Sequence, residues 1–199
     1  MSSESIQTAI GHLQAGEIIA YPTDTLFGLG VDALNTEAIK KLYQLKQRNQ
    51  QRPMSIMVPL KNWEQWVKSI PASAEKLAQK FFPGAITLIM TAGDNIPKIL
   101  TQYTNGTIGV RVPNHPTCLE LLDSFGGPII TTSANLSNHP SAKDPDTIIE
   151  YFGDGVSYIL TDGPKPGGVA STVVDVSENE PIVLRVGIIP EFSIWRSLR

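Results

Sequence analysis

The stretch YPTDTLFGLG, residues 21–30, decides how this chain folds. An apolar run over residues 18–21 ends here, and it is followed by a proline, three polar residues and two glycines, namely Pro22, Thr23, Asp24, Thr25, Gly28 and Gly30. Because proline cannot donate to a strand ladder and glycine has no side chain, this pattern is typical of a rigid polar loop leaving a buried strand. Such loops often carry function. The same composition also occurs at ordinary turns, which this stretch alone favours.

Length and composition indicate one compact domain over residues 1–199, since the chain is 41% apolar and long enough to bury a core. The formal charge of −3 argues against wrapping duplex nucleic acid by charge alone. The single cysteine, Cys118, excludes a disulfide framework and multi-cysteine metal sites. It falls on the apolar face of a predicted helix, so we expect a buried thiol. No leader-like or membrane-length apolar run occurs, so we expect a soluble, cytoplasmic protein without membrane contact.

Apolar residues recur at helical or strand spacing along the whole chain. The spacing predicts helices over residues 6–13, 36–46, 60–70, 74–81, 116–125, 145–152 and 192–198. Asn35 and Ser73 are expected to cap the second and the fourth of these helices. Strands are predicted over residues 18–21, 29–31, 54–58, 85–91, 107–112, 128–130, 156–160, 171–176 and 182–186. Strands that alternate with helices, with strand-to-strand connections near the C-terminus, indicate an α/β fold with a mixed sheet.

Lys46 and Arg48 follow one of the predicted helices. Lys46 lies seven residues after Ile39, about two turns along the same apolar stripe, so its ammonium should leave the helix on the core side. The two cations could therefore face an interior cleft. A helix that ends in ordinary solvated basic residues is the alternative, and this segment alone favours it.

Arg111 lies inside a predicted strand, between two valines. An unpaired buried cation is very costly, so Arg111 should lie either on a solvated face or opposite an anionic ligand.

The segment TTSAN, residues 131–135, follows another predicted strand. Three hydroxyls and an amide are too polar for a strand interior, and their small side chains leave backbone N–H groups accessible to phosphate or carboxylate. A turn is the competing interpretation.

Common catalytic motifs are missing from the sequence. Gly28 and Gly30 lack the third glycine of a dinucleotide fingerprint, and neither GxxxxGK[ST] nor HExxH occurs. Ser133 and His139 lack the setting of a hydrolase nucleophile and base, and the three dispersed histidines suggest no metal site. Cations and hydroxyl clusters do gather at predicted element ends, which suits the binding of a polyanion such as a nucleotide.

Seven motifs now carry a resemblance that runs almost from end to end. They are YPTDTLFGLG, the K-x-R of Lys46 and Arg48, FPGAITL (82–88), GVRVPNHP (109–116), TTSANLS (131–137), GGVASTVVD (167–175) and LRVG (184–187). In order and spacing the chain resembles the YrdC-like domain proteins, the L-threonylcarbamoyladenylate synthases of transfer-RNA modification, in their short, single-domain form.

The resemblance implies an open twisted sheet with flanking helices and a concave basic cleft. It also implies an enzyme, a nucleotidyltransferase that forms threonylcarbamoyl-AMP and pyrophosphate from L-threonine, bicarbonate and ATP, with Mg²⁺ brought by ATP. Residues that match positions for L-threonine are Thr25, Arg111, Thr131 and Ser171. Those that match positions for ATP are Arg48, Thr107, Ser133, Asn135, Ser141 and Arg185. Lys46 and Arg48 are implied to be catalytic, and Lys46 and Asn135 to line the cleft.

Four positions depart from the family pattern: Asn49, Met57, Asn138 and Val186. Asn49 and Val186 replace prolines, Asn138 replaces a glycine, and Met57 stands where some members place a histidine that contacts threonine. Two alternatives stay open: a nonenzymatic RNA-binding module of the same fold, and a relative that forms carbamoyl-adenylate. Product hand-over to a threonylcarbamoyl-transferase complex is also expected.

Overall fold

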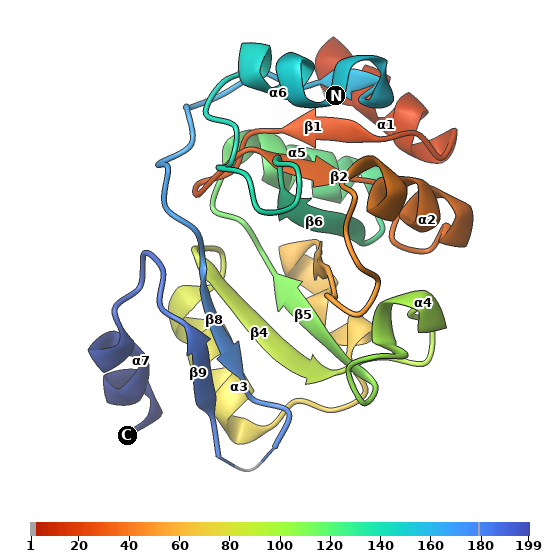
Figure 1. The fold of residues 1–199 in the computed structure, drawn as a ribbon. Coiled ribbons are helices and arrows are strands. Elements are labelled where there is room, and N and C mark those ends of the chain that lie inside the picture. The colour runs from red at the N-terminus through yellow and green to blue at the C-terminus, as the bar shows by residue number, and fades with distance from the viewer. Residues whose placement is uncertain (1–2, 179) are drawn as a thin grey trace.

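The computed structural model describes residues 3–178 and 180–199 and has an α/β fold built on a mixed sheet (Figure 1). Nine strands pair in the order β7-β1-β2-β6-β3-β5-β4-β8-β9. Three neighbouring pairs are parallel, β1 with β7, β3 with β5 and β4 with β8, and the other five are antiparallel. The mixed α/β fold predicted from the sequence is confirmed.

The helices and strands fall close to the predicted ranges. The strands are β1 Ile19–Tyr21, β2 Gly28–Gly30, β3 Ser55–Met57, β4 Ile86–Thr91, β5 Thr107–Arg111, β6 Ile129–Ser133, β7 Tyr158–Ile159, β8 Thr172–Asp175 and β9 Ile182–Arg185. The α-helices are α1 Glu4–Gln14, α2 Thr36–Leu45, α3 Ala72–Phe81, α4 Lys98–Thr101, α5 Pro116–Phe125, α6 Pro145–Phe152 and α7 Glu191–Leu198. Short 3₁₀ segments cover Leu60–Trp66 and Gly153–Gly155. In the part of the chain described, no helix is both long and apolar enough to cross a bilayer.

Two hydrophobic cores form because alternate residues of a strand point to opposite faces of the sheet. Ile19 and Tyr21 of β1 enter the smaller core, where α1 packs against α5, and Cys118 is buried there as predicted. Ala20 of the same strand enters the larger core, which also takes the apolar faces of α2, α3 and α6. This larger core continues beneath β4, β5 and β8.

The two glycines of the opening stretch make room for the ring of Tyr21. β1 pairs with β2 so that Tyr21 lies opposite Gly28, and a Cβ atom on Gly28 would stand 2.8 Å from that ring. The hydroxyl of Tyr21 passes the glycines and donates to the carbonyl oxygen of Ile130 at 3.0 Å. The GLG sequence is therefore a packing requirement of this strand pair.

Two predicted helix features are wrong. Residues 60–70 do not form one α-helix, because the 3₁₀ segment ends at Trp66 and the next backbone groups bond to β4, Lys68 N–H donating to the Thr91 carbonyl at 2.9 Å. Ser73 does not cap α3, since the helix already begins at Ala72 after Pro71. The predicted cap at Asn35 is confirmed by its side-chain contacts with Glu37 N–H and Ala38 N–H.

The expectation that residues 131–133 are too polar for a strand is also wrong. β6 continues through Ser133, and both of its neighbours hold it there: Thr132 pairs with Leu29 of β2, and Thr131 pairs with Ser55 of β3. Backbone pairing on both sides outweighs side-chain polarity when one face of the strand borders a polar pocket.

We expect Gly30→Ala to lower the free energy of unfolding by about 1–3 kcal/mol through overpacking. The new methyl group would stand 2.6 Å from the Ile130 carbonyl oxygen and 2.8 Å from the Tyr21 ring, neither of which can move freely. Urea unfolding followed by circular dichroism measures the change. Gly11→Ala is the matched control, because it has open space within α1 and should raise the stability by up to about 1 kcal/mol. A Gly30→Ala variant with the same free energy of unfolding as the wild type would contradict the packing argument.

Candidate functional site

A pocket of about 410 Å³ lies over the middle of the sheet, within the size range of small-molecule sites. Its described lining residues include three arginines and eleven hydroxyl side chains, but no acidic side chain. The hydroxyls belong to Thr23, Thr25, Ser55, Thr87, Thr104, Thr107, Thr131, Thr132, Ser133, Ser141 and Ser171. The pocket therefore offers positive charge and many small polar contacts.

Most of the residues implied by the resemblance meet in this pocket. Nine of them line it: Thr25, Arg48, Thr107, Arg111, Thr131, Ser133, Ser141, Ser171 and Arg185. Lys46 and Asn135 are not among the lining residues, so the expectation that they line the cleft is not met. Their assignment to catalysis and ATP stays a prediction.

Sequence reasoning missed three lining hydroxyls, those of Ser55, Thr87 and Thr104. Two of them had a signal, because Ser55 is the single hydroxyl of its strand and Thr87 stands between apolar residues in a strand whose only other hydroxyl is the terminal Thr91. Their neighbours along the strand alternate into the core, which turns these two side chains toward the pocket. Thr104 precedes β5 and had no comparable signal.

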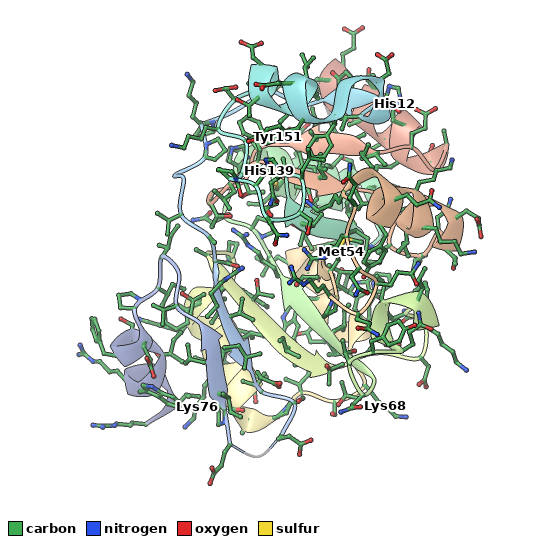
Figure 2. The ribbon with its side chains drawn as sticks, in the orientation of Figure 1. His12, Met54, Lys68, Lys76, His139 and Tyr151 are labelled. Atoms are coloured by element: carbon green, nitrogen blue, oxygen red, sulfur yellow. The ribbon has the colours of Figure 1, made fainter. Side chains whose placement is uncertain are left out.

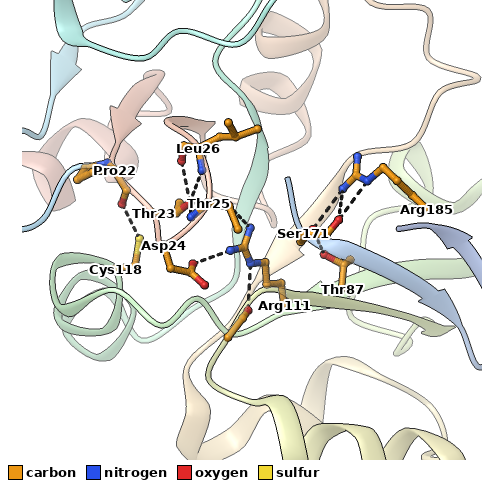
Figure 3. A network of polar contacts seen from close by, with 11 residues as sticks. Pro22, Thr23, Asp24, Thr25, Leu26, Thr87, Arg111, Cys118, Ser171 and Arg185 are labelled. Carbon is orange, nitrogen blue, oxygen red and sulfur yellow. Dashed lines mark hydrogen bonds and ion pairs between the residues drawn. The ribbon is translucent and has the colours of Figure 1, made fainter. Parts of the chain in front are cut away.

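Arg111 is 6% exposed and joins the loop after β1 to the centre of the sheet (Figure 3). Its guanidinium contacts Asp24 Oδ1 at 2.5 Å, donates to Thr25 Oγ1 at 2.8 Å, and reaches the Gly84 carbonyl at 3.4 Å. Of the two sequence interpretations, the solvated face is therefore excluded. Asp24 supplies the charge that a buried arginine needs, and the guanidinium has five N–H groups, so not all are used.

The loop that carries Asp24 and Thr25 is fixed by its own hydroxyls. Thr23 Oγ1 accepts hydrogen bonds from the N–H groups of Thr25 and Leu26 at 3.0 and 3.1 Å. The carbonyl of Thr25 accepts from Gly168 N–H at 2.7 Å, which ties this loop to the segment before β8. The threonines of the opening stretch thus hold a shape as well as line the pocket.

Arg185 holds the end of the pocket at β8 and β9. Its Nε and Nη2 atoms donate to the Ser171 carbonyl at 3.1 and 3.0 Å, and Nη2 also reaches Ser171 Oγ at 3.2 Å. Burial lowers the pKa of Arg185, and the positive charge of Arg111 lowers this pKa further. Two arginines that repel each other across one pocket favour the binding of an anion between them.

Arg48 lies at another side of the pocket and braces the loop that follows it. Its Nε atom donates to the Arg52 carbonyl at 3.0 Å and Nη2 to the Pro53 carbonyl at 2.9 Å. Burial lowers the pKa of this guanidinium. Its remaining N–H groups are available to a ligand.

Lys46 is 1% exposed and anchors the TTSAN segment from behind. Its ammonium donates to the Ser133 carbonyl, to the Asn135 carbonyl at 2.8 Å and to Asn135 Oδ1 at 3.3 Å. Burial lowers the pKa of Lys46 to about 7, and the charge of Arg48 acts in the same direction. The side chain lies on the core side of the helix, so the ordinary solvated helix end that this segment alone favours is wrong for Lys46. Its ammonium contacts loop oxygens.

Asn135 completes the anchored loop. Its Oδ1 atom accepts from Ser133 Oγ at 2.5 Å, and its Nδ2 group donates to the carbonyls of Leu136 and His139, both at 2.9 Å. The Nδ2 and Oδ1 atoms of Asn135 therefore make hydrogen bonds within the loop itself. The ring of His139 packs edge-on against Tyr151, with centroids 6.0 Å apart, and both are labelled in Figure 2.

Two of the departures from the family pattern can be placed. Asn138 has a φ of +67°, a conformation that glycine adopts freely and asparagine tolerates better than most residues, so it is a mild replacement. Met57 is fully buried in the smaller core and is not among the pocket residues. Its difference from the family therefore lies outside the pocket lining.

A family model described as "Telomere recombination", which joins Sua5, YciO and YrdC proteins, matches residues 11–187. The chain belongs to the Sua5/YciO/YrdC family. The threonylcarbamoyl-AMP synthase of Pyrococcus abyssi is 35% identical, and the match covers 93% of this chain but 54% of that protein. The putative threonylcarbamoyl-AMP synthase of Mycobacterium tuberculosis is also 35% identical, with 93% and 85% covered.

Solved structures of the Sua5/YciO/YrdC family share this fold. The crystal structure of P. abyssi Sua5 complexed with L-threonine superposes with a TM-score of 0.91 at 34% identity, covering 96% of this chain and 56% of that chain. The present chain thus spans about half the length of the P. abyssi protein and most of the mycobacterial one.

The lowered pKa of Lys46 predicts a pH dependence of stability. An unfolded lysine has a pKa near its ordinary value of 10.5, so between about pH 7 and that value the unfolded chain binds more protons at Lys46 than the folded chain. The cost of burying the charge is therefore largest below pH 7 and is relieved as the pH rises. Relative to Lys46→Met, the wild-type free energy of unfolding should gain up to roughly 1 kcal/mol per pH unit in this window.

Urea unfolding at pH 7, 8, 9 and 10 measures this difference. Lys41→Met is the matched control, because it removes a lysine that is exposed on α2. If the difference in free energy of unfolding between the wild type and Lys46→Met does not change from pH 7 to 10, the folded chain keeps Lys46 charged over this whole range.

Proposed function

We propose that this chain is an L-threonylcarbamoyladenylate synthase. It would form threonylcarbamoyl-AMP and pyrophosphate from L-threonine, bicarbonate and ATP, in the service of transfer-RNA modification. The observation that carries the proposal is the single pocket in which Arg48, Arg111 and Arg185 meet eleven hydroxyls without an acidic lining residue. The names of the relatives and the L-threonine complex of P. abyssi Sua5 support it.

The reaction needs little covalent chemistry from the protein. The threonine amine attacks the carbon of bicarbonate, a C–N bond forms and water leaves, which gives a carbamate; a carbamate oxygen then attacks the α-phosphorus of ATP. A P–O bond forms there, the bond to the bridging oxygen breaks, and pyrophosphate leaves with that electron pair. Positioning and charge neutralisation supply most of the catalysis in such transfers, which matches a pocket of arginines and hydroxyls.

Arg111 is proposed to mark the amino-acid end of the pocket, with Thr25, Thr131 and Ser171. Its pairing with Asp24 keeps the guanidinium fixed, while its unused N–H groups suit a carboxylate. A fixed donor loses little entropy on binding, which favours recognition of a small substrate.

The phosphates are proposed to lie between Arg48 and Arg185, with Thr107, Ser133 and Ser141 on the same side. Asn135 would contribute to ATP binding through the loop that its amide holds. Burial and mutual repulsion lower the pKa of Arg185, and an anion would relieve that repulsion. Lys46 would act through the loop it anchors, since its ammonium lies on loop oxygens. Arg48 would stabilise charge on the phosphates.

Mg²⁺ is proposed to enter with the phosphates of ATP. Within residues 3–178 and 180–199, no group of three or more His, Cys, Asp or Glu side chains could hold a metal ion. Direct RNA binding and hand-over of the product to a threonylcarbamoyl-transferase complex stay predictions from the resemblance.

The direct test measures pyrophosphate release by the full chain with Mg–ATP, bicarbonate and L-threonine. We expect release only when all three substrates are present, and threonylcarbamoyl-AMP should be seen by mass spectrometry. Release without threonine, or none under any condition, would overturn the synthase assignment. Steeply salt-dependent RNA binding without turnover would favour the RNA-binding module instead.

Arg185→Gln should lower kcat/KM by roughly 30- to 1,000-fold, because loss of one donor to a developing charge costs about 2–4 kcal/mol. The matched control is Arg196→Gln, which removes an exposed arginine on α7 outside the pocket lining. Equal activity of the two variants would remove Arg185 from the phosphate site. Their circular dichroism spectra show whether each has folded.

A further inference from the structure

Thr87 is a buried hydroxyl of β4 to which neither the resemblance nor the proposed mechanism gives a role. The residue is 4% exposed and lines the pocket. Its Oγ1 atom lies 3.0 Å from Ser171 Oγ (Figure 3). Across the described ranges, this is the one hydrogen-bond partner of the Thr87 hydroxyl.

Ser171 has a second partner that fixes its position. Arg185 donates to the Ser171 carbonyl through two nitrogens, and Nη2 also donates to Ser171 Oγ at 3.2 Å. A guanidinium can only donate, so this contact occupies one lone pair of the serine hydroxyl. The direction of the remaining contact, between Thr87 and Ser171, decides where the serine proton points.

Two arrangements of the protons are possible, because Thr87 and Ser171 are about equally buried, at 4% and 5% exposed, and both line the pocket. If Ser171 donates to Thr87, the threonine proton can point into the pocket. If Thr87 donates to Ser171, both lone pairs of the serine oxygen are occupied, by Thr87 and by Arg185, and the serine proton points into the pocket. In both arrangements the hydrogen-bonded pair presents one O–H donor to solvent or a ligand.

We propose that Thr87 is a positioning residue that holds the Ser171 hydroxyl in place, so that the hydrogen-bonded pair presents one O–H donor to the amino-acid substrate. A donor in this place recognises a carboxylate or carbamate oxygen and gives nothing to an ammonium group. Arg111, a donor of the opposite charge to a carboxylate, lines the same pocket. The inference rests on the proposed function and adds to it the residue that positions Ser171.

The test compares two substitutions at one position with a control on the same strand. Thr87→Val keeps the shape and removes the hydroxyl, so the dissociation constant of L-threonine, measured by isothermal titration calorimetry on the full chain, should rise about fivefold. Thr87→Ser keeps the donor and should bind nearly as the wild type does. Thr91→Val, on the same face of β4 but outside the pocket lining, should leave binding unchanged.

A double-mutant cycle separates positioning from a general structural effect. In the Ser171→Ala background, Thr87→Val should weaken threonine binding no further. In the wild-type background, Thr87→Val should raise KM for threonine in the turnover assay and leave KM for ATP unchanged. Wild-type affinity in Thr87→Val, or an equal loss in both backgrounds, would overturn the inference while the synthase stands. A wild-type chain that neither binds threonine nor releases pyrophosphate would overturn the proposed function and this inference with it.

Discussion

The buried contact between Arg111 and Asp24 is the constraint on which the rest of the pocket depends. It joins the loop after β1 to the end of β5, two parts of the chain separated by 87 positions in sequence. Breaking such a pair by removing one partner typically costs about 3–5 kcal/mol, because the other charge stays buried and unpaired. Asp24 offsets the charge of this guanidinium, and the N–H groups that Asp24 leaves unused can still donate to a ligand.

Small hydroxyl side chains suit strands that have a hydrophobic core on one face and a polar pocket on the other. A strand must bury one face in a core and can turn the other toward a polar ligand only if its side chains are small and need few partners. Ser55, Thr87 and Thr131 meet both conditions on β3, β4 and β6. The result is a sheet face that can contact an anion through many weak donors, with three arginines supplying the charge.

The anchoring of the TTSAN segment by Lys46 connects the helical layer to the pocket. The lysine leaves α2 at its C-terminal cap, and its ammonium lies on the carbonyls of Ser133 and Asn135. A movement of α2 would therefore also move the TTSAN segment, whose Ser133 lines the pocket. A lysine placed in this way shapes the pocket through the segment it holds, although it does not line the pocket itself.

Local spacing was enough to predict the mixed α/β class and most of the helices and strands. The motifs of the resemblance named eleven candidate residues, and nine of these line the pocket. Tertiary structure alone decided the rest. Lys46 and Asn135 left the lining because their polar atoms find partners within the loop, and residues 131–133 became strand because β2 and β3 pair with both edges. Whether a polar group faces a ligand or a neighbouring carbonyl depends on contacts between distant segments, which no local pattern records.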